Sequence, residues 1–132
     1  MREIKFRGYA LEEMVNSQWI IGYGVSEIEF AEHYAKEVGR NSDWWLSTEG
    51  GYCRVIHESI GQYTGKKDKE GNEIYEDDIL QESGTGKLFR CEWVDVLAAF
   101  KLVLMTEPDT MFGMSVAGDF TVVGNVHELG VG

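Results

Sequence analysis

The chain has 132 residues, with 23 acidic and 12 basic side chains and a formal net charge of −11. A chain of this length is expected to form one domain, or two small lobes that share a core. The acidic excess argues against binding of a nucleic-acid backbone, which depends on clustered lysine and arginine. The same charge favours solubility and permits contact with basic surfaces.

The cysteines and the N-terminal residues bear on where the protein resides. Cys53 and Cys91 lie far apart, and neither belongs to a Cys-x-x-Cys pair. Small secreted folds usually carry more cysteines, so we expect two reduced thiols in an intracellular protein. The first residues hold no signal-peptide run, and no window approaches the roughly 20 apolar residues of a membrane helix. We therefore expect a cytoplasmic protein without a membrane partner.

The N-terminal lobe, residues 1–59, carries several strand signals. Alternation of apolar and basic residues predicts a strand over 4–9. The apolar run over 18–25 predicts a second strand that is buried on both faces. Two further apolar runs, 44–46 and 52–56, flank a Gly-Gly pair and predict a hairpin.

Residues 26–39 have a different period. Ser26 and Glu29 have the spacing of a capping box, and Gly39 fits a C-terminal cap. Apolar residues between them recur on one helical face. The segment therefore predicts a short helix, with a loop as the alternative.

The most constrained stretch runs from Ile60 to Leu80. Its first strand is followed by a charged turn in which Asp68 and Gly71 suit a type I turn with a bulge. A second strand then leads into the acidic turn 76–78. The stretch predicts strand, tight turn, strand, acidic turn and strand.

The C-terminal lobe, residues 60–132, continues with short strands separated by turns. After the constrained stretch, strands are predicted over 79–82, 87–94, 98–105 and 120–126, with Trp93 on a buried face. Such a series is typical of a small closed barrel. The predicted fold class is mainly β, as a β-rich α+β fold.

The constrained stretch also carries a family resemblance. The chain resembles the signature of the YopX-like family of bacteriophage and prophage proteins in Gly61-Gln62-Tyr63-Thr64-Gly65, Lys67-Asp68-Lys69, Gly71, Glu73-Ile74-Tyr75-Glu76 and Asp78-Ile79. Its segments 1–7 and 123–128 are similar to that family's two ends. Asp77 stands where the resemblance leads us to expect glycine, although aspartate tolerates left-handed backbone better than most residues.

The resemblance implies a fold and an origin, but no established activity. It implies a β-rich fold in which an SH3-like small barrel, residues 60–132, packs with the N-terminal strand and helix lobe. The two lobes would together form one YopX-like unit. It also implies that the protein is encoded by a phage or prophage.

The sequence contains no pattern that points to catalysis. No glycine-rich loop precedes Lys-Ser/Thr, and the three histidines are scattered. The acids around Asp68 lack the distant glutamate of a calcium loop. We expect no enzymatic activity, cofactor or metal site. The alternative is a hydrolase-like cleft that joins Asp68, Asp78 or His57.

The candidate binding residues fall in two groups. The constrained stretch contributes Gln62, Tyr63, Thr64, Asp68, Glu76 and Asp78, and the hairpin contributes Trp44 and Trp45. The first group could instead build turns and strand register. Because adjacent strand residues face opposite ways, one of the two tryptophans is expected to point outward and mark a contact site.

These features favour a small accessory protein that binds a host or phage protein. An acidic mimic of nucleic acid is one alternative, since 13 acids and 6 bases follow residue 59. The other is a barrel that binds nucleic acid directly. Pairing of the chain with itself through a strand edge also stays open.

Overall fold

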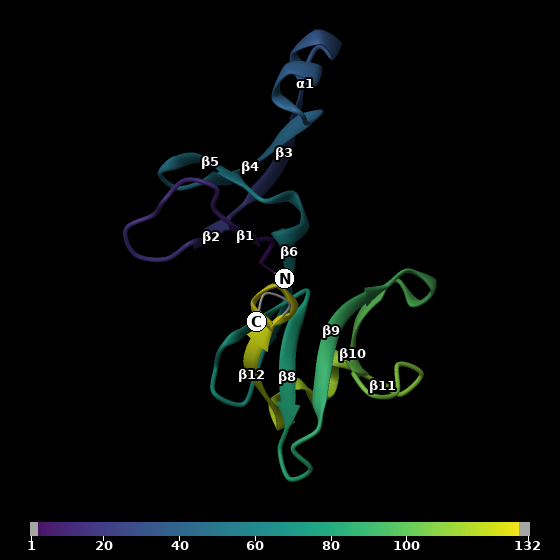
Figure 1. Cartoon of the computed structure of the whole chain (residues 1–132). Helices are drawn as coiled ribbons and strands as arrows, with labels where there is room; N and C mark the ends of the chain where they lie inside the picture. Colours follow the sequence, from purple (N-terminus) through teal and green to yellow (C-terminus); the bar gives the residue numbers. More distant parts are fainter. Residues whose placement is uncertain (1–2, 130–132) are drawn as a thin grey trace. The chain divides into compact units, whose positions relative to one another are not determined.

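A computed structural model describes residues 3–129 of the chain (Figure 1). The predicted β-rich fold is confirmed, and the strands of the described residues pair in antiparallel fashion. The chain divides into an N-terminal unit, Ile4–Gln62, and a C-terminal unit that runs from Tyr63 onward and also includes Glu3. The division falls inside the constrained stretch, whereas the sequence placed the lobe boundary before residue 60.

The N-terminal unit contains two small sheets. In one, β1 pairs with β2 and with the first residues of β6. In the other, the strand order is β3–β4–β5. The bounds are β1 (Phe6–Tyr9), β2 (Trp19–Gly22), β3 (Gly24–Glu29), β4 (Ser42–Thr48), β5 (Gly51–Val55) and β6 (Gly61–Lys67).

The strand predicted over 18–25 is two strands. It breaks at Tyr23, whose N–H donates to the Ser47 carbonyl at 2.8 Å. The prediction of burial on both faces is also wrong, because Ile21 is 40% exposed. The strand predicted over 4–9 is confirmed over Phe6–Tyr9, and the hairpin 44–56 is confirmed.

The core of the N-terminal unit depends on a close approach between Gly22 and β4. Leu46 and Val55 are buried there. A Cβ built on Gly22 would lie 2.9 Å from both the Leu46 Cβ and the Ser47 carbonyl oxygen. Glycine is therefore required at this position.

The predicted helix over 26–39 is wrong in its first half. Ser26 and Glu29 belong to β3, which pairs with β4 through the whole of its length. The helix α1 covers only Glu32–Val38, and its N-cap residue Ala31 makes no side-chain cap. Strand pairing satisfies the backbone groups that a helix would have used, so the capping box does not form. Gly39 does cap α1, with a left-handed φ of 80°.

The C-terminal unit is built around a five-stranded sheet. Its order is β11–β10–β9–β8–β12. The five strands are β8 (Asp78–Glu82), β9 (Leu88–Val94), β10 (Ala99–Leu104), β11 (Met111–Gly113) and β12 (Phe120–Asn125). A further strand, β7 (Glu73–Tyr75), pairs with β6. The short helices of the chain are η1 (His57–Ser59), η2 (Asp95–Leu97), η3 (Met114–Asp119) and α2 (Val126–Leu129).

One sheet face of this unit forms an aromatic and aliphatic core. Its largest fully buried members include Phe89, Phe120, Leu80 and Leu102. Trp93 was predicted on the buried face but is 44% exposed. It lies near the end of β9, where its ring packs edge-to-face against Phe100 with ring centroids 5.1 Å apart. The SH3-like character of the barrel stays a prediction.

The two predicted turns of the constrained stretch are confirmed. Gly71 adopts a left-handed φ of 85° in the turn between β6 and β7. Asp77 adopts a left-handed φ of 73° in the acidic turn. Its carboxylate lies 2.8 Å from the Arg90 guanidinium. The aspartate thus takes the backbone geometry expected of glycine.

We predict that Gly22→Ala destabilises the N-terminal unit by about 1–3 kcal/mol, because the new methyl group overlaps Leu46 and the β4 backbone. Urea unfolding followed by circular dichroism measures the change. Gly24→Ala is the matched control, because its Cβ would meet only the Ser47 Cβ at 3.7 Å. It should stay within about 0.5 kcal/mol of the parent chain. Equal stability of the two variants would contradict the close approach.

Candidate functional site

The candidate residues of the constrained stretch are mostly buried. Gln62 and Glu76 are half-buried. The buried ones are Tyr63, Thr64, Asp68 and Asp78. Their side chains form internal hydrogen bonds: the Thr64 hydroxyl donates to the Ile74 carbonyl, and the Tyr75 N–H donates to the Asp78 carboxylate, both at 2.8 Å. This arrangement favours a structural role, and their role in binding stays a prediction.

Asp68 connects the turn between β6 and β7 with β12. Its Oδ1 accepts the N–H groups of Glu70 and Asn72 at 2.9 and 2.8 Å. Its Oδ2 accepts the Asn72 side-chain amide at 3.2 Å and the Val122 N–H at 2.8 Å. Burial by itself would raise the pKa of this carboxyl, but the donated hydrogen bonds hold the pKa below its usual range.

The two tryptophans are less exposed than predicted. Trp44 and Trp45 are both half-buried, so the expectation of one outward, exposed tryptophan is wrong. The Trp44 ring stacks on His57, with ring centroids 4.0 Å apart. The Trp45 indole N–H is buried. The two side chains do leave β4 on opposite faces, and each is partly buried.

The cysteines and the possible metal ligands of the described residues do not favour nucleophilic catalysis or metal binding. Cys91 is buried. Burial, and then the nearby Glu12 charge, raise the pKa of the Cys53 thiol, which keeps it protonated at neutral pH. Across residues 3–129, no three histidine, cysteine or acidic side chains converge as metal ligands. No helix of this part of the chain is long and apolar enough to cross a membrane.

The N-terminal unit carries an arm formed by residues 24–43. It consists of β3, α1 and the start of β4, and Figure 1 shows the two strands running out to α1. None of these residues is buried. Ile28 is 55% exposed and Tyr34 is 45% exposed. The arm therefore contributes almost nothing to the core.

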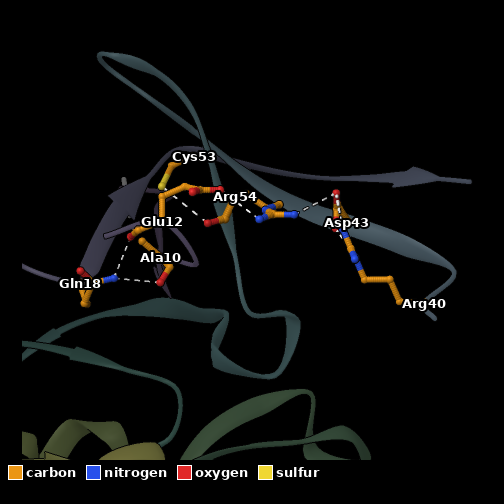
Figure 2. A network of polar contacts seen from close by, with 7 residues as sticks. All are labelled: Ala10, Glu12, Gln18, Arg40, Asp43, Cys53 and Arg54. Carbon is orange, nitrogen blue, oxygen red and sulfur yellow. Dashed lines mark hydrogen bonds and ion pairs between the residues drawn. The ribbon is translucent and has the colours of Figure 1, made fainter. Parts of the chain in front are cut away.

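A polar network holds the base of the arm (Figure 2). Arg54 on β5 lies 3.0 Å from a Glu12 carboxylate oxygen and 3.5 Å from an Asp43 carboxylate oxygen. Asp43 also receives a 2.8 Å hydrogen bond from Arg40. This hydrogen bond is the main reason that the pKa of Asp43 is lowered. The network fixes the arm through surface charges instead of apolar packing.

A hollow of about 510 Å³ lies along the arm, between β3 and α1. Its lining includes the acids Glu27, Glu29 and Glu32. The basic residues beside it have partners: Lys36 lies 3.4 Å from Glu32, and Arg40 bonds Asp43. The Glu27 carboxylate accepts the Ser42 hydroxyl at 2.7 Å. Glu27 and Glu29 therefore give this side of the arm an acidic character.

Sequence reasoning missed the arm because it assigned residues 26–29 to a helix. A signal was present in the segment. Val25 and Ile28 are β-branched, and Glu27 and Glu29 alternate with less polar residues. That alternation is the period of a strand.

We predict that Asp68→Asn lowers the free energy of unfolding by about 1–3 kcal/mol at pH 7, because an NH₂ group then faces N–H donors. The pKa of Asp68 is lower in the folded chain than in the unfolded chain, where it is about 3.9. The stabilisation by the Asp68 carboxylate is therefore complete when the pH is above the unfolded pKa, and it is lost as the pH falls through the folded pKa. The deficit of the variant should therefore shrink in acid. Denaturant unfolding at pH 7 and at pH 3 measures both effects.

Glu70→Gln is the control for this prediction, since it removes the same charge from an exposed side chain of the same turn. It should change the stability by less than about 0.5 kcal/mol. An Asp68→Asn protein as stable as the parent at pH 7 would contradict the structural role.

Comparison with known proteins places the chain in a family. No curated protein matches the chain. The sequence model of the family described as YopX protein matches residues 5–130, which is nearly the whole chain. The signature residues in the buried turns of the C-terminal unit lie within the matched range. The chain therefore belongs to the YopX protein family.

Proposed function

We propose that this chain is a non-enzymatic protein-interaction module that binds a partner protein through the arm, residues 24–43. The observation that carries the proposal is that the arm has defined secondary structure but no buried residue. Its outer part, where Ile28 and Glu29 pair with Asp43 and Ser42 beyond the reach of β5, is a two-stranded ribbon, which is marginal in stability in water. An exposed element of this kind is typical of a surface that a partner protein covers in a complex.

The charge of the arm indicates the kind of partner. Residues 24–43 hold five acidic and two basic side chains. Both basic side chains, Lys36 and Arg40, pair within the arm. An acidic, partly apolar surface is complementary to a basic protein surface, and such complementarity also speeds association. The proposed partner is therefore a host or phage protein with a basic contact surface.

The proposed setting is the cytoplasm of a host cell, with the protein encoded by a phage or prophage. The resemblance to phage and prophage proteins supports this origin. The two cysteines without a disulfide are consistent with a reducing compartment. The raised pKa of the Cys53 thiol supports a role without nucleophilic catalysis.

We predict that tagged protein retains a partner protein from bacterial lysate after nuclease treatment, and that a shortened arm, which keeps β3 only as far as Ile28, weakens this retention. In the shortened variant an Asn-Gly turn replaces residues 29–42 and joins the paired residues Ile28 and Asp43. Mass spectrometry of the retained proteins provides the measurement. Added salt should weaken retention, because charges contribute to it.

Two controls accompany this experiment. The shortened variant should keep the far-UV spectrum and melting behaviour of the rest of the chain, because it loses no buried residue. Val96→Ser removes a side chain that is 94% exposed on η2, outside the arm, and should leave retention unchanged. Equal retention by the parent and shortened proteins would refute the role of the arm. Loss of all retained protein with nuclease would refute the protein partner.

A further inference from the structure

One side of the arm is the outer edge of β3. β3 lies at the edge of the β3–β4–β5 sheet, and within residues 3–129 it pairs with no strand other than β4. Every residue from Val25 to Glu29 is exposed. We infer that this edge accepts an extended, basic segment of the partner protein as an added antiparallel or parallel strand. The inference rests on the proposed function, because it specifies how the arm would bind.

The register shows which backbone groups are free to pair. The Phe30 N–H donates to the Asn41 carbonyl at 2.8 Å, directly beyond the paired residues Glu29 and Ser42. In an antiparallel ladder, hydrogen-bonded and non-hydrogen-bonded pairs alternate. Ser26 and Ile28 therefore bond β4. The N–H and C=O groups of Val25, Glu27 and Glu29 point to the open edge.

The edge is long enough for strand addition. β3 has six residues, which is the common length of a strand in a sheet. In this recognition mode the main chain supplies affinity, and alternate side chains supply specificity. Three residues with outward backbone groups give an added strand several sites for hydrogen bonding.

The side chains of β3 determine what the added segment must carry. Glu27 and Glu29 lie on one face of the strand, and Ile28 lies on the other. Side chains directly opposite each other on neighbouring strands lie about 4.5–5.5 Å apart, close enough for charges to interact. Lysine or arginine at alternate positions would meet the two carboxylates, and an apolar residue between them would cover Ile28.

The same charges disfavour a second copy of the chain at this edge. Antiparallel pairing of two β3 strands would bring Glu27 and Glu29 of one copy beside the same residues of the other. Like charges on paired strands are destabilising, and charged edges are a common protection against self-pairing. A basic segment relieves this repulsion, so a foreign strand fits the edge better than a second copy does.

The test uses the full chain, labelled with ¹⁵N, and a seven-residue peptide that alternates lysine and valine. Peptide binding should slow amide hydrogen exchange at Val25, Glu27 and Glu29 by at least about tenfold, because their N–H groups gain acceptors. Ser26 and Ile28 already bond β4 and should change little. A peptide that alternates glutamate and valine, and a lysine peptide with N-methylated amides, serve as negative probes.

Two double variants separate the edge from the rest of the arm. Glu27→Gln with Glu29→Gln should weaken binding of the lysine peptide by about tenfold, because it removes both charges beside the added strand. Glu32→Gln with Glu37→Gln removes the same charge from α1 and should bind nearly as the parent does. Both double variants lose two negative charges, so the ratio of their affinities for the lysine peptide excludes the effect of net charge.

Protection of the three amides that depends on the charges of β3 supports strand addition. Absence of that protection, or chemical-shift changes centred on α1, overturns it even if the shortened arm still loses the cellular partner. If the amides are not protected but the shortened arm loses the cellular partner, the proposed interaction module is retained and only strand addition is rejected. A dimer of the parent chain that protects the same amides without peptide would assign the edge to a second copy and overturn the choice of partner.

Discussion

The buried carboxylate of Asp68 joins segments that are distant in the sequence. One oxygen closes the turn between β6 and β7, while the other accepts the N–H of Val122 in β12. Because unsatisfied buried donors are costly, the turn and β12 depend on the same charge. The Thr64 and Asp78 hydrogen bonds extend this dependence to β7 and β8. The constrained stretch is thus the structural centre of the C-terminal unit.

The arm, in contrast, is stabilised without a buried polar group. Its strands are held by backbone pairing, and its base is held by the charges of Arg54, Asp43 and Arg40. No residue of the range 24–43 is fully buried. Exposed ion pairs contribute little to stability, so the arm is a weakly stabilised element that a partner could reinforce. This difference favours contact through the arm over contact through the buried signature residues.

The sequence predicted features that depend on local backbone geometry, and it missed features that depend on distant segments. The left-handed positions Gly71 and Asp77 depend on their own backbone geometry, and both were predictable. Ser26 and Glu29 have the spacing of a helix start, yet they form a strand. The deciding partner is β4, in which Trp45 pairs with Ser26 and Ser42 pairs with Glu29. A local pattern contains no information about such a competitor.

The sequence by itself determined the β-rich class, most strand positions, the two turns of the signature and the family resemblance. These features arise from periodicity, glycine geometry and residue identity. Only the tertiary structure decided which polar and aromatic residues are available for contact. Trp44 is covered by His57, and Asp68 is enclosed by its own turn and β12, whereas the edge of β3 stays open. Exposure depends on which distant segments cover a residue, and no local pattern encodes that.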